Sequence, residues 1–511
     1  MRGFFLQERW QWPGWRRVAV AFGLGAVMAL GQAPLEWWFV ALPALVALTL
    51  LIVRSSSARV AAWSGLFAGA GYFGLALSWI VEPFLIDVAT YGWMSPFAVA
   101  FMSFGLALFW ALAAAVSQWI VRGFSSRALA FALALTAAEL LRGVVLTGFP
   151  WALIGHIWIG VPPAQLAAII GPNGLTLMTT LAAALPVAFR LRGTLVSGVM
   201  LAAAWGFGVA QLAQPDPTDE NAATVRLVQP NIAQNMKWDS ALARINLQSL
   251  MDLSAKDPAP GQPRPDLVVW PETALPYLFR GDDTGLLAAI AGSGRGAQMA
   301  IGVQRLDPQN AFRGFNSLAV ISPDATLTDS YDKHHLVPFG EYIPFGDLAF
   351  RWFGLSAFAA QMGNGYTAGP GPRVLDLGPK LGLALPLICY EAVFPQGLRV
   401  ATRPRFILQI TNDAWFGELT GPYQHLAQAR LRAIEQGLPF LRAANTGVSA
   451  VIDARGRVLA ELPLGVSGIL DASVPPALAP TLYARLGEVP ILVLLIGLSA
   501  LLVVISRRAR P

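Results

Sequence analysis

Cysteine is almost absent from this sequence, because Cys389 is the only one in 511 residues. A lone thiol cannot close an intramolecular disulfide, and the paired Cys and His spacings of zinc sites are missing. We therefore expect no metal and no cofactor. Cys389 is either a small buried hydrophobe or a reactive thiolate, and the residue type alone favours the first.

Charged residues are also scarce. They make up 13% of the chain, whereas hydrophobic residues make up 55%, which predicts an integral membrane protein with an added polar domain. The net charge of +6 does not indicate nucleic acid, because residues 1–212 and 489–511 hold 14 basic but only 5 acidic residues. Only four of the 36 basic residues are lysines, so a lysine inside a motif is informative.

Hydrophobic runs predict eight transmembrane helices, each near the length that crosses ~30 Å of hydrocarbon. They lie at 18–33, 37–53, 60–81, 92–121, 125–142, 164–189, 194–212 and 489–506. Arginines gather at alternate ends of these runs, so the positive-inside rule predicts cytoplasmic termini and an outer, periplasmic position for residues 213–488. The Arg-rich N-terminus could begin a signal peptide, but an uncleaved anchor in the inner membrane is favoured.

Glu139 and Arg142 are the notable charges within the hydrophobic part. They lie three residues apart at the predicted outer boundary and therefore share one helix face. They form either a structural ion pair or a contact with lipid headgroups.

The pattern changes after a polar, proline-rich linker at 211–220. Short apolar runs predict strands at 225–228, 267–270, 299–303, 317–321, 383–388, 406–410, 448–453 and 458–461. Helices are expected at 240–253, 285–292 and 427–436. This alternation is typical of a layered α/β domain.

Three residues with side chains that can act in catalysis follow these predicted strands or lie between them. Glu272 stands just past the strand at 267–270, Lys333 lies in an aromatic loop with Glu341, and Cys389 ends the strand at 383–388. Alone, Glu272 would be an ordinary loop acid or helix cap. A thiol with a pKa near 8.5 needs a base to attack a carbonyl, and the resulting oxyanion needs a fixed positive charge. Glu272 can be that base, and Lys333 can supply that charge.

The order Glu, Lys, Cys and its flanking motifs resemble the nitrilase superfamily. The motifs are WPE at 270–272, KxHLVPFGE at 333–341, CYE at 389–391, TNDAWF at 411–416 and NTGVS at 445–449. With VQPNI at 228–232, KW at 237–238 and LTGFPW at 146–151, the chain resembles the bacterial apolipoprotein N-acyltransferases. The resemblance implies seven helices in 1–212, a nitrilase-like αββα sandwich in 213–488, and an eighth helix in 489–511.

The resemblance further implies acyl transfer from a phospholipid, preferably phosphatidylethanolamine, to the N-terminal amine of a diacylglyceryl-cysteine lipoprotein. Cys389 would be the nucleophile and would carry the acyl chain as a thioester. We expect supporting roles for Glu341, Tyr390 and Glu391, because one base suffices.

Aromatic residues of the outer domain are candidates for contact with the lipid substrates. The segment 345–358, which includes Trp352 and Phe353, is either a mobile arm that dips into the membrane interface or buried core. Trp238 is a further lid candidate, with aromatic core packing as the alternative.

Other functions fit the sequence less well. A membrane-tethered amidase or nitrilase would use the same three residues with water as acceptor, but eight spans favour a lipid substrate. A transporter would need more ionisable residues near the bilayer midplane, and a scaffold would not need the three residues together. We expect a monomer whose partners are the phospholipid donor, the lipoprotein acceptor and membrane lipids, without nucleic acid.

Overall fold

The computed structural model describes residues 14–217, 219, 221–343 and 365–508. The chain divides into two compact units. The helical unit comprises the chain up to Gln214, residues 419–427 and the chain from Thr481 onward. The sheet unit comprises residues 215–418 and 428–480.

The helical unit is built almost entirely of apolar helices. Its elements are α1 (Gly14–Ala29), α2 (Trp38–Val53), α3 (Ala58–Ala76), η1 (Ser78–Val81), α4 (Glu82–Leu85), α5 (Val88–Tyr91), η2 (Gly92–Met94), α6 (Ser95–Trp119), α7 (Phe124–Arg142), η3 (Ile154–Trp158), η4 (Pro162–Leu166), α8 (Ala167–Leu212), α15 (Leu482–Leu486) and α16 (Val489–Arg508). Within the described ranges, four helical segments are long and apolar enough to cross a membrane: 88–119, 124–142, 162–212 and 489–508. Helix α3 and the helical segment Ser78–Leu85 are bent by 66° relative to each other, and they would form a fifth span if they cross the membrane together as one broken helix.

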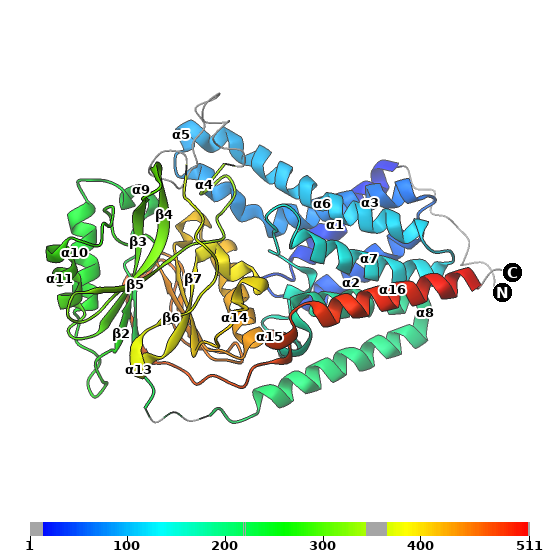
Figure 1. The fold of residues 1–511 in the computed structure, drawn as a ribbon. Helices are drawn as coiled ribbons and strands as arrows, with labels where there is room; N and C mark the ends of the chain where they lie inside the picture. The colour runs from blue at the N-terminus through cyan, green and yellow to red at the C-terminus, as the bar shows by residue number, and fades with distance from the viewer. Residues whose placement is uncertain (1–13, 218, 220, 344–364, 509–511) are drawn as a thin grey trace. The chain divides into compact units, whose positions relative to one another are not determined.

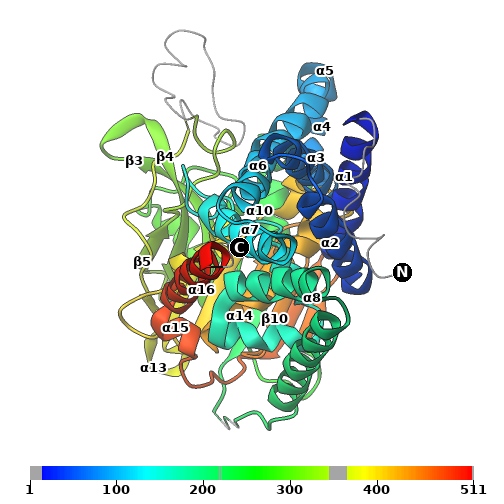
Figure 2. The ribbon, with the colours of Figure 1, turned by 90° about the vertical axis from the view of Figure 1, so that its right-hand side faces the viewer.

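Helix α8 is not one continuous rod. Arg190 has φ 53° and ψ −131°, which breaks the helical path. Ser197 Oγ then donates a hydrogen bond to Ala182 O at 2.8 Å, although 15 residues of continuous helix would separate them by about 22 Å. The chain therefore folds back at Arg190 into two arms, as Figure 2 shows. The break lies between the two spans predicted at 164–189 and 194–212.

The sheet unit contains two six-stranded sheets (Figure 1). The first has the order β12 (Gly468–Ser473), β1 (Thr224–Gln229), β2 (Leu267–Val269), β3 (Gln298–Asp307), β4 (Asn310–Ile321) and β5 (Leu327–Asp332). The second has the order β11 (Val458–Leu462), β10 (Ser449–Ile452), β9 (Phe440–Ala444), β8 (Phe406–Thr411), β7 (Leu383–Ile388) and β6 (Leu375–Asp376). In each sheet three central strands are parallel and the outer pairings are antiparallel.

Helices cover the first sheet on its outer side. Figure 1 shows α10 (Ala243–Ser254) and α11 (Thr284–Ser293) there, and Leu250 and Ile290 from these helices pack with Val268 and Met299 of the sheet. The shorter helices are α9 (Gln234–Lys237) and α13 (Gly378–Leu381), and α14 spans Gly421–Gln436. The parallel strands β1, β2, β8 and β9 are buried along their whole length, and β3 and β7 are buried except near their ends, which explains why most of their residues are apolar.

The α/β architecture with two sheets is the one predicted from the sequence. The predicted strands and helices of this part of the chain are present, although α14 begins six residues earlier than expected. Strands β5, β6, β9 and β12 were not predicted. Among the described residues, four helical segments, or five with the bent pair, are long and apolar enough to cross a membrane. These segments do not by themselves show the eight separate spans that the sequence predicts.

Candidate active site

Cys389 occupies a sharp turn directly after strand β7. Its φ of +50° lies in the left-handed region, and the 3-10 helix η5 (Cys389–Val393) begins at the same residue. A non-glycine residue in this region costs on the order of 1–3 kcal/mol and persists only where its surroundings hold it. The cysteine turn, residues 388–391, is therefore a built feature, and it presents the only thiol of the chain.

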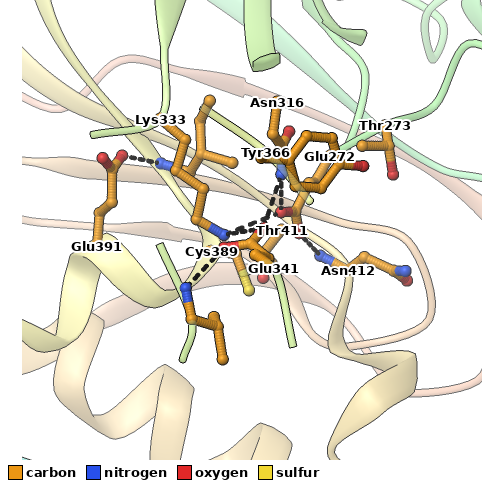
Figure 3. Close-up of polar contacts among 12 residues, drawn as sticks. Glu272, Thr273, Asn316, Lys333, Glu341, Tyr366, Cys389, Glu391, Thr411 and Asn412 are labelled. Carbon is orange, nitrogen blue, oxygen red and sulfur yellow. Dashed lines mark hydrogen bonds and ion pairs between the residues drawn. The ribbon is translucent and has the colours of Figure 1, made fainter. Parts of the chain in front are cut away.

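Glu272 follows strand β2, and its carboxylate is held from three directions (Figure 3). Asn316 Nδ2 donates to Glu272 Oε1 at 2.7 Å, and the backbone N–H of Asn412 donates to Oε2 at 2.9 Å. Lys333 Nζ lies 3.3 Å from Oε1. The carboxylate is thus fixed in orientation while remaining in contact with a cation.

Lys333 follows strand β5 directly and is buried. Its Nζ donates to Glu341 Oε1 at 2.8 Å, and Glu341 Oε2 accepts the backbone N–H of Val337. Burial alone would lower the pKa of Lys333, but the charges of Glu341 and Glu272 outweigh it and raise that pKa well above its usual value. Lys333 is therefore a permanent cation between two carboxylates. Burial raises the pKa of Glu341, against the opposing effect of Lys333.

The thiol of Cys389 is buried beside these charges, as Figure 3 shows. Burial, followed by the negative charge of Glu272, raises the pKa of Cys389 far above its usual value, and the nearby Lys333 only partly opposes this. The resting thiol is therefore protonated at neutral pH. Nucleophilic attack by its sulfur requires that a base take the proton as the attack proceeds, and Glu272 is the adjacent carboxylate.

Glu391 ties the cysteine turn to the loop that follows Lys333. Its carboxylate accepts backbone N–H groups of Ile388 at 2.8 Å, His334 at 2.8 Å and His335 at 3.2 Å, and it accepts the hydroxyl of Tyr331. Burial would raise the pKa of Glu391, but the His334 side chain, the backbone N–H of Ile388 and the charge of Lys333 together lower it. A carboxylate with so many donors is saturated, which favours the predicted supporting role.

Tyr390 is buried in the same turn. Its ring makes edge contacts with Phe394 at 4.9 Å and His335 at 5.7 Å between centroids. This packing again favours support of the turn.

A buried polar network lies behind the cysteine turn and was not predicted. Gln409 Nε2 donates to the backbone oxygen of Cys389 at 2.9 Å, and Arg442 donates to Gln409 Oε1 at 2.5 Å. Arg442 also pairs with Asp413, and both side chains are fully buried. Arg442 therefore braces the turn through Gln409.

The structure thus brings Glu272 and Cys389 together with Lys333 and Glu341 of the motif at 333–341, although Glu272 and Cys389 each lie more than 45 residues from that motif. Sequence reasoning assigned no role to Asn316 or to the backbone N–H of Asn412. An amide beside an apolar strand was the only local signal for Asn316, whereas Asn412 lies within a motif already noted.

Glu139 and Arg142 lie inside the helical unit. Their carboxylate and guanidinium are 2.6 Å apart, and both side chains are almost completely buried. Trp110 Nε1 donates to Glu139 at 2.7 Å, and Arg142 donates to Trp151 O at 2.9 Å. This placement favours the structural ion pair over a headgroup contact.

Of the lid candidates, Trp238 is half-buried, with its ring 5.7 Å from Lys237 Nζ. Trp352 and Phe353 lie outside the described residues.

Comparison with known proteins gives two family matches. The carbon-nitrogen hydrolase family matches residues 224–482, and the apolipoprotein N-acyltransferase N-terminal domain matches residues 24–185. The apolipoprotein N-acyltransferase of Caulobacter vibrioides is 40% identical over 508 residues, covering 94% of this chain and 93% of the relative. That of Rhodopseudomonas palustris is 38% identical, covering 97% and 96%. A solved nitrilase-superfamily protein of Saccharomyces cerevisiae is 20% identical, with a TM-score of 0.39, covering 51% of this chain and 93% of that one.

Proposed function

We propose, from the premise that this chain belongs to the apolipoprotein N-acyltransferase family, that Glu272, Lys333 and Cys389 carry its reaction. The chain is an N-acyltransferase of lipoprotein maturation, with a lipid donor and a lipoprotein substrate. The observation that carries the assignment is the contact of one buried ammonium, Lys333, with two carboxylates beside the only thiol.

The first half-reaction moves an acyl chain to the enzyme. The proton of the Cys389 thiol passes to the Glu272 carboxylate while the sulfur electron pair attacks the ester carbonyl carbon of the phospholipid. The carbonyl oxygen becomes an oxyanion, which the Lys333 ammonium stabilises. The intermediate collapses to a thioester, and the leaving lysophospholipid oxygen takes the proton from Glu272.

The second half-reaction regenerates the enzyme. The neutral N-terminal amine of the diacylglyceryl-cysteine lipoprotein attacks the thioester carbonyl, and Glu272 accepts a proton from the attacking nitrogen. Collapse forms the amide and releases the Cys389 sulfur, which recovers the proton from Glu272. We expect phosphatidylethanolamine as the preferred donor, as the resemblance of the motifs implies.

The eight-span topology belongs to this proposal. The break at Arg190 supports it by dividing the longest helix into two arms. We propose cytoplasmic termini, domain boundaries near 212 and 488, a periplasmic sheet unit and a monomeric enzyme.

The test follows the thioester. Purified protein is incubated with labelled phosphatidylethanolamine, and intact mass and peptide analysis locate an acyl adduct. A diacylated lipopeptide with a free amine is then added. We expect an adduct on Cys389 that disappears as the peptide gains an amide-linked chain, and none in Cys389→Ala. Loss of the adduct to free fatty acid without peptide acylation would favour the amidase-type alternative, and absence of any adduct would refute the proposal.

A further inference from the structure

Lys237 is a second buried lysine of the sheet unit, and the mechanism above does not use it. It ends the short helix α9 and is only 4% exposed. Lysine is among the residues least often buried, and buried lysines are as a rule paired. A buried ammonium in a chain with four lysines therefore needs a physical reason.

The ammonium of Lys237 contacts the turn that carries the base. Its Nζ donates to the backbone oxygen of Glu272 at 2.9 Å and to Thr273 Oγ1 at 2.7 Å. Thr273 has φ +46°, which is unfavourable for a β-branched residue and must be held by its neighbours.

Strand β3 packs against the same turn. A Cβ added at Gly302 would lie 2.1 Å from the backbone oxygen of Pro271 and 2.7 Å from the Cα of Glu272. Lys237 and the bare backbone at Gly302 therefore fix the position from which the Glu272 carboxylate extends.

The charge of Lys237 also acts on the reacting groups. Both of its hydrogen-bond acceptors are uncharged, so they do not neutralise the ammonium. Burial lowers the pKa of Lys237 to about 8, while the charges of Glu272 and Cys389 oppose that fall. Lys237 is therefore mostly charged at neutral pH and loses its charge a little above it.

We propose that Lys237 is a positioning residue of the acyl transfer: it clamps the Glu272–Thr273 turn, and its charge favours ionisation of Cys389. This inference rests on the proposed function, because it assigns Glu272 as the base. Lys333 stabilises the oxyanion and stays charged throughout, whereas Lys237 acts through the base and the thiol.

The experiment compares Lys237→Met, Lys237→Arg and the exposed control Lys256→Met in full-length protein. Two rates are measured from pH 6 to 10: acylation of Cys389 by phosphatidylethanolamine, and alkylation of Cys389 by iodoacetamide. Thermal unfolding shows whether each variant is folded. Measuring only the first half-reaction keeps the acceptor amine out of the profile.

We expect K237M to lower both rates about tenfold at pH 7, because it removes one charge and two hydrogen bonds from the turn. Wild-type acylation should decline as the pH rises through about 8, and K237R should move that decline to higher pH. K256M should match wild type. If K237M does not fold, the test rests on K237R. An acylation rate that declines near pH 8 in K237R, as in wild type, would overturn the inference.

Rates in folded K237M that match wild type would also overturn it. Slower alkylation of Cys389 in K237M than in wild type supports the inference, whether or not wild type forms an acyl adduct. Absence of an acyl adduct on wild type would count only against the proposed function.

Discussion

Glu391→Gln is the substitution that most directly tests how the cysteine turn is held. The carboxylate receives backbone N–H groups on both oxygens: those of His334 and His335 on Oε1, and that of Ile388 on Oε2. A glutamine side chain has one accepting oxygen and one donating amide. Whichever way it is turned, at least one buried backbone N–H faces another donor.

The cost can be worked from these contacts. One unsatisfied buried N–H costs about 1–3 kcal/mol, and loss of charge-assisted bonds adds a similar amount, so we expect a destabilisation of about 3 kcal/mol. For a large domain this lowers the thermal midpoint by about 6–12 °C. The turn also carries Cys389, so acylation should slow by about tenfold or more even below the transition.

The assay pairs thermal unfolding in detergent with the rate of Cys389 acylation. Glu461→Gln on strand β11 is the matched control, because Glu461 is exposed and the same charge is lost there. We expect Glu461→Gln to match wild type in both readouts. A Glu391→Gln protein with wild-type midpoint and acylation rate would refute the argument that Glu391 holds the turn.

Three further predictions follow from the same contacts. Asn316→Leu removes the amide that bonds Glu272 and Glu341, so acylation should fall about 10- to 100-fold, measured as adduct formation. Glu139→Gln leaves Arg142 buried without its anion, and unfolding should show a loss of about 3–5 kcal/mol; an unchanged midpoint with a raised KM for phospholipid would indicate a headgroup contact. Because the pKa of Glu391 is lowered in the fold, its stabilisation is present above the ordinary carboxyl pKa of about 4.3 and is lost as the pH falls below it, so the wild-type midpoint should drop more between pH 5 and 3 than that of Glu391→Gln.

The sequence predicts a site residue well where that residue directly follows a buried apolar strand. Glu272 and Cys389 each follow an apolar run whose burial forces the next polar residue to the sheet edge. Lys333 follows strand β5, which was not predicted because most of its residues are polar and only Tyr331 is fully buried. Its motif, rather than its strand, identified it.

Other parts of the site depend on contacts that no local pattern contains. Strand β9 escaped prediction because Arg442 interrupts its apolar residues, and this arginine is buried only because Gln409 and Asp413 receive it. The roles of Asn316 and Lys237 likewise depend on distant partners. Lys237 bonds the backbone oxygen of Glu272, 35 residues away, and Asn316 bonds the Glu272 carboxylate, 44 residues away. Long-range pairing of buried polar groups is decided by the tertiary fold.

The charge balance of the site explains how a thiol with a raised pKa can still be the nucleophile. Lys237 and Lys333 oppose Glu272 and Glu341, so the four buried groups are balanced when Cys389 is protonated. Ionising the thiol alone would add an uncompensated negative charge, which burial makes expensive. Moving its proton to a carboxylate instead keeps the total charge constant, and the negative charge then passes from the carboxylate through sulfur to the oxyanion without leaving the reach of Lys333. A free thiolate would also be open to alkylation and oxidation at rest, so the same balance confines the reactivity of Cys389 to moments when an ester carbonyl is in place.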